Sequence, residues 1–177
     1  MKNRYAFINS FSFSLIFKLF VLGIASFSLY LHIDIDDLPN TFRFFGYFTV
    51  LSNLFCFIIL LLNIIKMIYN RISFSEKYTA LKEYSHFFVL FKGMSLMSII
   101  LTFFIFHYMV ANYKYPLLIN NILNLPIKDL FAHYLLPLFY VIDWLLFAPK
   151  GLQKLNAPFI WTLYPFVYLT FTFVRLY

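Results

Sequence analysis

Polar side chains that can take part in hydrogen bonding and acid–base chemistry stand inside long apolar stretches of this chain. Along the stretch at residues 43–69, a helical advance of about 100° per residue places one polar stripe among phenylalanine, leucine and isoleucine. The stripe consists of Gly46, Thr49, Ser52, Asn53, Cys56, Leu60 and Asn63. Polar groups are costly in lipid, so the stripe is expected to face inward. It either mediates contact between helices or lets Thr49, Ser52 and Asn53 line a site.

A histidine in a later apolar stretch is the second candidate. Pro137 has no N–H and cannot bond the carbonyl of His133, so a kink is expected there and that carbonyl is left free beside the imidazole. His133 shares a helical face with Pro137, Tyr140 and Trp144. Imidazole titrates near neutral pH and can accept a proton. A histidine near a membrane helix end can also serve only as an interfacial hydrogen-bonding residue.

The expected depths of these residues in a membrane place several of them in one layer. Thr49 lies six residues into its stretch, roughly 9 Å along a helix, and His133 lies four residues into its own, roughly 6 Å. If both helices run from outside to inside, the two side chains share the outer half and meet where the helices are neighbours. His107 and Arg175 belong to the same layer.

Three charged residues collect in the opposite half. Asp143 follows His133 by ten residues, about 15 Å along a helix, so it cannot orient that imidazole. An unpaired carboxylate at this depth would be costly. We therefore expect Asp143 to pair with Lys18 or Lys92. The alternative for the lysines is to extend toward the lipid headgroups.

Five apolar stretches position all of these residues. They cover residues 11–31, 43–69, 86–112, 129–147 and 158–177. Each is close to the ~20 residues that a helix needs to cross a bilayer, and backbone groups in lipid must be satisfied within the segment. A chain that is 63% hydrophobic, 24% aromatic and 12% charged is too apolar for a soluble domain. The sequence predicts an all-α, polytopic transmembrane helix bundle of five spans, forming one domain over residues 1–177.

The positive charge of the chain favours a membrane orientation over nucleic-acid binding. The net charge is +7, but the basic residues lie beside the ends of the apolar stretches. Basic residues occur near the N-terminus, at the second connection and at the fourth connection: Lys2, Arg4, Lys66, Arg71, Lys77, Lys82, Lys150 and Lys154. The first connection instead carries Asp34, Asp36 and Asp37. This alternation predicts a multi-pass protein of the cell membrane with a cytoplasmic N-terminus. The first apolar stretch is too long for a cleavable signal peptide and is expected to remain as a helix.

The sequence contains no motif for binding a metal or a cofactor. The lone Cys56 cannot form an intramolecular disulfide or a thiolate metal cluster. With four glycines in the whole chain, no phosphate-binding loop or Rossmann glycine pattern is present. We expect no metal and no cofactor.

Three segments together resemble the bacterial Pr6Pr membrane proteins. The segment from Phe45 to Leu54 resembles their F-T-x-L-S-N motif, and the segment from His133 to Phe147 resembles H-x-x-x-P followed by D-W-L-L-F. The segment from Trp161 to Tyr168, followed by Arg175, is similar to W-x-x-Y-P-x-x-Y and a later arginine. The family usually continues into a sixth span, whereas this sequence ends at Tyr177, so five spans are expected.

The resemblance implies a chemistry. The Pr6Pr group is distantly similar to the animal AIG1-like membrane hydrolases, which cleave lipid esters of the fatty-acid-ester type with a membrane-embedded threonine and a histidine. By this resemblance Thr49 is the nucleophile and His133 the base, with Asn53 or Arg175 polarising the ester or holding a lipid carboxylate. The partners would then be membrane lipids, and acyl chains would enter sideways from the bilayer.

A non-enzymatic membrane protein, either a small transporter or a partner subunit, is the alternative. The charged residues of the inner half and the polar residues of the outer half would then form a polar path. A chain of 177 residues lacks the inverted repeat of many transporters, so transport would require a homo-oligomer.

The charge pattern generates a topology prediction. Single cysteines introduced at Asp36 and at Lys77 should react with a membrane-impermeant maleimide from opposite sides of the membrane, because these residues lie in connections at opposite ends of the second span. Labelling of both from one side would contradict the orientation.

Overall fold

The computed structural model describes residues 10–33, 37, 46–73, 85–114, 124–149, 153 and 155–176. Its regular elements are all helical in these ranges. They are α1 (Phe11–Tyr30), α3 (Phe48–Ser73), α4 (His86–Ile105), the π-helix η2 (Phe106–Ala111), α5 (Asn112–Lys114), α6 (Ile127–Leu130), the π-helix η4 (Phe131–Leu135), α7 (Leu136–Phe147), α8 (Ala157–Trp161) and α9 (Leu163–Leu176).

Five segments are long and apolar enough to cross a membrane, which confirms the predicted all-α, five-span architecture. They are Phe11–Tyr30, Phe48–Ser73, His86–Ala111, Ile127–Phe147 and Ala157–Arg175. The second span begins at Phe48 and continues to Ser73, past the predicted end at residue 69. Residues 43–45 of the predicted span, and Tyr177 of the fifth, lie outside the described residues. Asp36 and Lys77, the two labelling positions, lie outside them as well.

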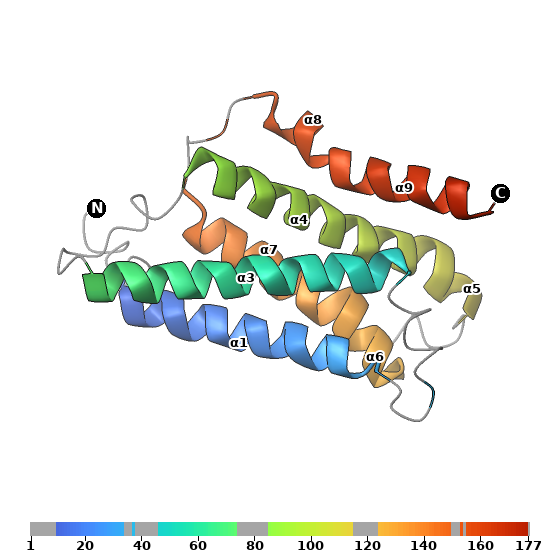
Figure 1. Cartoon of the computed structure of the whole chain (residues 1–177). Helices are drawn as coiled ribbons and strands as arrows, with labels where there is room; N and C mark the ends of the chain where they lie inside the picture. The colour runs from blue at the N-terminus through green and yellow to red at the C-terminus, as the bar shows by residue number, and fades with distance from the viewer. Residues whose placement is uncertain are drawn as a thin grey trace.

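Four of the spans form a bundle. Helix α1 packs against α3 and α7, and α4 packs against α3 and α7, so the four helices enclose one core (Figure 1). Its buried residues are Val21, Ile24, Ala25, Cys56, Leu60, Leu96, Ile99, Leu136 and Tyr140. The polar stripe predicted on the second span faces this interior in part, since Ser52, Asn53, Cys56 and Asn63 are buried.

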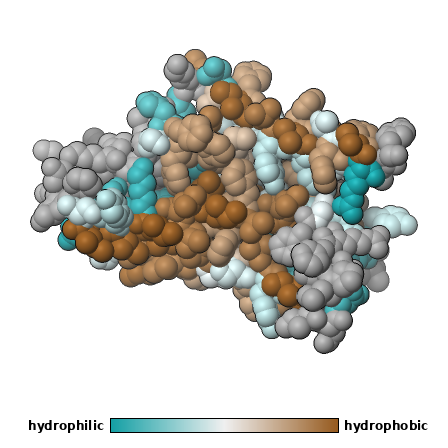
Figure 2. Space-filling view, viewed as in Figure 1, coloured by the Kyte–Doolittle hydropathy of each residue, from teal (hydrophilic) through white to brown (hydrophobic). Residues whose placement is uncertain are grey.

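The outer surface of the bundle is apolar where lipid would contact it. Isoleucine, leucine and phenylalanine side chains on every span are exposed, including Ile16, Phe20, Ile65, Phe104 and Phe166. Figure 2 shows apolar residues across the middle of the visible face and hydrophilic residues mainly toward its ends. This distribution is the one expected of a helical protein surrounded by hydrocarbon.

Two of the spans contain π-helical turns. In the fourth, the N–H of Leu136 donates to the carbonyl of Phe131, five residues earlier. Pro137 follows directly, so the wide turn lies where the missing N–H of proline was predicted to produce a kink at His133. A π-helical segment thus takes the place of the expected kink. The second, η2, continues α4 and contributes to the same region of the molecule as His133.

The fifth span lies on the outside of the bundle, along α4 (Figure 1). Most side chains of α9 are exposed, and the chain breaks helical continuity at Thr162, between α8 and α9. The break lies one turn before Pro165, which has no N–H to donate to the preceding turn. At the start of the span, the ring of Trp161 occupies the space that a Cβ atom on Gly93 would need. Glycine at this position allows α8 to approach the backbone of α4 closely.

We predict that Gly93→Ala displaces Trp161 and weakens the docking of the fifth span. Adding a methyl group to a filled contact typically destabilises a protein by about 1–3 kcal/mol. Thermal unfolding in detergent should show the loss, and the tryptophan emission spectrum should change. Gly23→Ala is the matched control, because no atom lies within 4 Å of the added Cβ and alanine favours a helix. Equal stability of the two variants would contradict the proposed contact.

Candidate functional site

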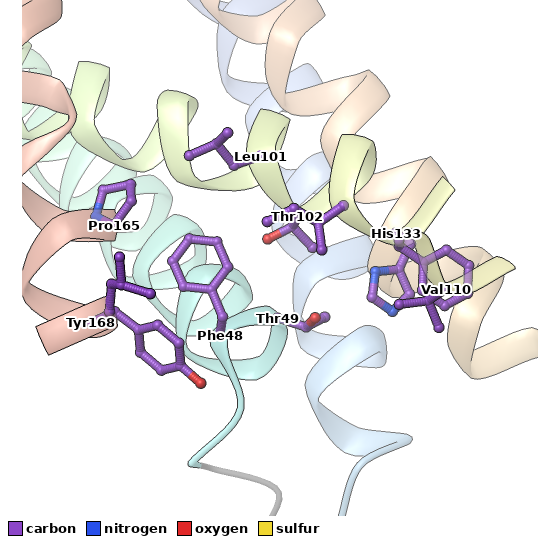
Figure 3. Close-up of a pocket in the computed structure, with 11 residues that line it drawn as sticks. Phe48, Thr49, Leu101, Thr102, Val110, His133, Pro165 and Tyr168 are labelled. Atoms are coloured by element: carbon purple, nitrogen blue, oxygen red, sulfur yellow. The ribbon is translucent and has the colours of Figure 1, made fainter. Parts of the chain in front are cut away.

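One pocket brings together the two residues that the sequence singled out. It has a volume of about 410 Å³ and lies where the start of α3 meets α4, η2, η4 and α9 (Figure 3). Its lining residues are Phe48, Thr49, Leu101, Thr102, Ile105, Phe106, Val110, His133, Pro165, Tyr168 and Leu169. Only four of them carry a polar side-chain group, and none is an acid, a lysine or an arginine. The site is therefore an apolar cavity with a few hydrogen-bonding groups, as is usual for sites that bind small molecules.

His133 is held in the wall of this pocket by stacking. Its ring lies against Phe106 of η2, with centroids 3.6 Å apart and an interplanar angle of 10°. Only 8% of the residue is exposed, and no hydrogen-bond partner of Nδ1 is found among the described residues. A buried polar nitrogen without a partner is unfavourable and rare. The imidazole is therefore fixed in orientation, and its buried Nδ1 has no partner among the described residues.

Thr49 is the second residue of α3 and is half-buried in the opposite wall. In the described structure its hydroxyl makes no hydrogen bond, in contrast to Thr102, whose Oγ1 donates to the carbonyl of Ser98 at 3.0 Å. Thr102 follows the common pattern in which a helical threonine bonds to the preceding turn. Thr49 is thus the pocket threonine whose hydroxyl is not committed to a backbone acceptor.

The Thr49 and His133 side chains face the same cavity without a direct hydrogen bond (Figure 3). Hydrogen bonds between catalytic groups are often long in the absence of substrate and shorten when it binds. The sequence-based expectation that the two side chains share one depth agrees with this placement, since α3 and η4 are in contact.

Tyr168 is a pocket residue that the sequence did not single out for the site. Its hydroxyl donates to the carbonyl of Gly46 at 2.9 Å, and its ring lies 5.0 Å from that of Phe48. These contacts join α9 to the start of α3. At helical spacing Tyr168 shares a face with Trp161, Pro165 and Arg175, but an interfacial anchor explains a membrane tyrosine equally well. Only the three-dimensional contact with Gly46 distinguishes the two roles.

Four residues expected to support the site lie elsewhere. The Nδ2 group of Asn53 donates to Ser28 Oγ of α1 at 2.8 Å, and Ser52 is fully buried; neither lines the pocket. His107 Nδ1 is 3.1 Å from the hydroxyl of Tyr134. Arg175 is exposed in the last turn of α9. None of the four is among the residues that line this pocket.

The three charged residues that the sequence placed in the opposite half of the spans form one buried cluster. Lys18 of α1 and Lys92 of α4 each place Nζ 2.5 Å from a different carboxylate oxygen of Asp143 on α7. The three residues are 0%, 1% and 0% exposed, so the lysines do not extend to the headgroups and that alternative is wrong. The pairing expected from the sequence is confirmed, with both lysines instead of one. The ammonium group of Lys18 also lies 4.4 Å from the centre of the Phe147 ring.

We predict an asymmetry in how the lysine–aspartate cluster responds to substitution. Lys18→Met or Lys92→Met leaves one lysine paired with one aspartate, whereas Asp143→Asn removes the carboxylate that both buried ammonium groups share. Removing the shared partner of a buried ion pair typically destabilises by about 3–5 kcal/mol. Unfolding in detergent should therefore rank Asp143→Asn as clearly the least stable. Equal losses from all three variants would show that the cluster is not held by charge.

Comparison with protein-family models, curated proteins and solved structures finds no match to this chain. The assignment of its type therefore depends on the helices and the pocket themselves. Five helices long and apolar enough to cross a bilayer make it a multi-pass membrane protein.

Proposed function

We propose that this protein is a membrane-embedded hydrolase of lipid esters, with Thr49 as nucleophile and His133 as its base, and that it belongs to the Pr6Pr group it resembles. The supporting observation is that an uncommitted threonine hydroxyl and a histidine nitrogen without a partner line one apolar pocket. A threonine hydroxyl is a weak nucleophile at neutral pH and needs such a base. The sequence resemblance and the geometry thus point to the same pair of residues.

The proposed reaction proceeds in two halves. Thr49 Oγ1 attacks the ester carbonyl carbon while its proton passes to His133. The tetrahedral intermediate then expels the alcohol oxygen, which takes that proton, and leaves an acyl group on Thr49. Water attacks the acyl carbon in the second half, again giving a proton to His133. Return of this proton to Thr49 releases the fatty acid and restores the hydroxyl.

The walls of the pocket suit an acyl substrate. Phe48, Leu101 and Phe106 line its interior side, whereas Ile105, Val110 and Leu169 are also exposed on the outer surface of the helices. In a membrane these exposed residues face hydrocarbon, so the cavity borders the lipid phase. A lipid ester would enter laterally, with its chains against apolar residues throughout.

Ion or proton transfer is the second candidate, favoured by the buried Lys18–Asp143–Lys92 cluster. Between this cluster and the pocket, Ser95 Oγ and the Tyr140 hydroxyl are 2.5 Å apart in the same interior. Buried charged and hydroxyl groups at several depths are typical of membrane relays. Such a role depends on Asp143 and not on the hydroxyl of Thr49. The variants Asp143→Asn and Thr49→Ala therefore separate the two functions.

We predict that purified protein in liposomes hydrolyses long-chain esters and that Thr49→Ala abolishes this activity. Thr49→Ser should retain part of it, because the hydroxyl survives. His133→Ala should lower the rate by about 10²–10⁴, the usual contribution of a positioned base. Fatty-acid release measured by mass spectrometry provides the rates.

Matched variants separate loss of chemistry from loss of structure. Thr170→Ala removes an exposed threonine hydroxyl on α9 that bonds to the carbonyl of Phe166. His107→Ala removes an imidazole that lies outside the pocket. Both should remain close to the wild-type rate. Wild-type activity no higher than that of Thr49→Ala, over several lipid esters, would reject the hydrolase and favour a non-enzymatic role.

A further inference from the structure

The first turn of α3 offers hydrogen-bond donors that the helix itself does not use. Among the described residues, the first backbone bond at this end runs from the N–H of Leu51 to the carbonyl of Tyr47, at 3.1 Å. The N–H groups of Phe48, Thr49 and Val50, which begin the helix, therefore have no acceptor within it. Two of these residues, Phe48 and Thr49, line the pocket. Both belong to the described chain, and no acceptor for their N–H groups is found there.

The setting of these donors strengthens their effect on a negative charge. Helix α3 is 26 residues long, and the positive end of its dipole lies at Phe48. The cavity in front of it is apolar, and no charged side chain is among its lining residues. Backbone donors and helix dipoles act more strongly on a charge in such a low-dielectric site than in water.

A second feature of the pocket points independently to a ligand. His133 is more than nine-tenths buried, lines the same cavity, and has Nδ1 without a partner among the described residues. The cavity thus presents backbone donors, a hydroxyl and an unused imidazole nitrogen. An ester needs this combination, because its carbonyl oxygen becomes negative as the hydroxyl loses a proton to a base.

The position of this helix end is fixed by the fifth span. Tyr168 donates from α9 to the carbonyl of Gly46, two residues before Phe48. The ring of Tyr168 also packs on that of Phe48. Tyr168 is therefore a positioning residue for the first turn of α3 and the pocket wall opposite it.

We propose that the backbone N–H groups of Phe48 and Thr49 form an oxyanion site, held in place by the bond from Tyr168 to Gly46. The proposal rests on the proposed ester hydrolase and deepens it. The ligand class is a neutral carboxylic ester whose carbonyl oxygen gains charge during the reaction. Thr49 then supplies both the attacking hydroxyl and one of the donors that stabilise the product of its attack.

Backbone substitution tests the donors without changing any side chain. Incorporating phenyllactic acid at Phe48 replaces the N–H by an oxygen and keeps the ring. The matched control is the same substitution at Phe57, in the middle of α3, where it removes a helical hydrogen bond away from the pocket. Two quantities are measured: ester hydrolysis, and binding of hexadecylphosphonate, an unreactive tetrahedral anion, by ³¹P NMR in micelles.

Loss of one donor should lower kcat by about 10²–10³ with little change in KM, because the interaction is made in the transition state. Phosphonate binding should weaken by about 10- to 100-fold, as expected for a lost hydrogen bond to an anion. The Phe57 substitution should leave both quantities near wild type. Tyr168→Phe should lower kcat and phosphonate affinity in parallel, by less than the Phe48 substitution, and leave the circular dichroism spectrum unchanged.

The two measurements separate this proposal from the hydrolase itself. Phosphonate binding that depends on the Phe48 N–H supports the anion site even if no ester is cleaved, in which case only the hydrolase is rejected. Active protein whose kcat and phosphonate affinity are unaffected at Phe48 overturns the oxyanion site and leaves the hydrolase standing. Equal losses at Phe48 and Phe57 also overturn it, since they show a general effect on the helix.

Discussion

The ion cluster of Lys18, Asp143 and Lys92 is the interaction on which the packing of the other helices in the bundle depends. It joins α1, α4 and α7 at one depth, with each lysine on a separate carboxylate oxygen. Such charges are too costly to expose to lipid, so helix packing that separates them is strongly disfavoured. In lipid, apolar packing alone distinguishes poorly between helix registers. This contact therefore fixes the position of the three helices along one another.

The half of the bundle that contains the pocket departs from regular helix packing at several points. His133 lies in a π-helical segment, Phe106 begins another, Thr49 stands in the first turn of α3, and α9 covers the gap. The first turn of α3 leaves backbone N–H groups that a continuous α-helix would bond, and the two π-helical segments hold His133 and Phe106 against each other. π-Helical turns and helix ends are frequent at functional sites for this reason. One half of the bundle thus holds the buried ion cluster, and the other half retains a cavity.

The sequence was sufficient for the spans and for the order of the polar residues along each helix, because hydropathy and helical rise depend only on local sequence. It therefore predicted that Thr49 and His133 share a layer and that Asp143 meets a lysine. It did not predict that both lysines bind, or that Asn53 turns to Ser28 and His107 to Tyr134, because these contacts depend on how the helices rotate. The role of Tyr168 was hidden for the same reason, since its partner is a backbone carbonyl distant in sequence.

The two halves of the bundle differ in packing. This difference explains how a small membrane protein can be rigid in one half and keep an accessible pocket in the other. A lipid-facing site needs a wall that is not tightly packed, and the fifth span supplies it, being largely exposed and attached to the bundle mainly through α4. Two contacts limit its freedom: the close approach of Trp161 to Gly93 at one end, and the bond from Tyr168 to Gly46 near the other. Because the second contact also holds the start of α3, the fifth span forms one wall of the pocket and also positions the residues of the wall beside it.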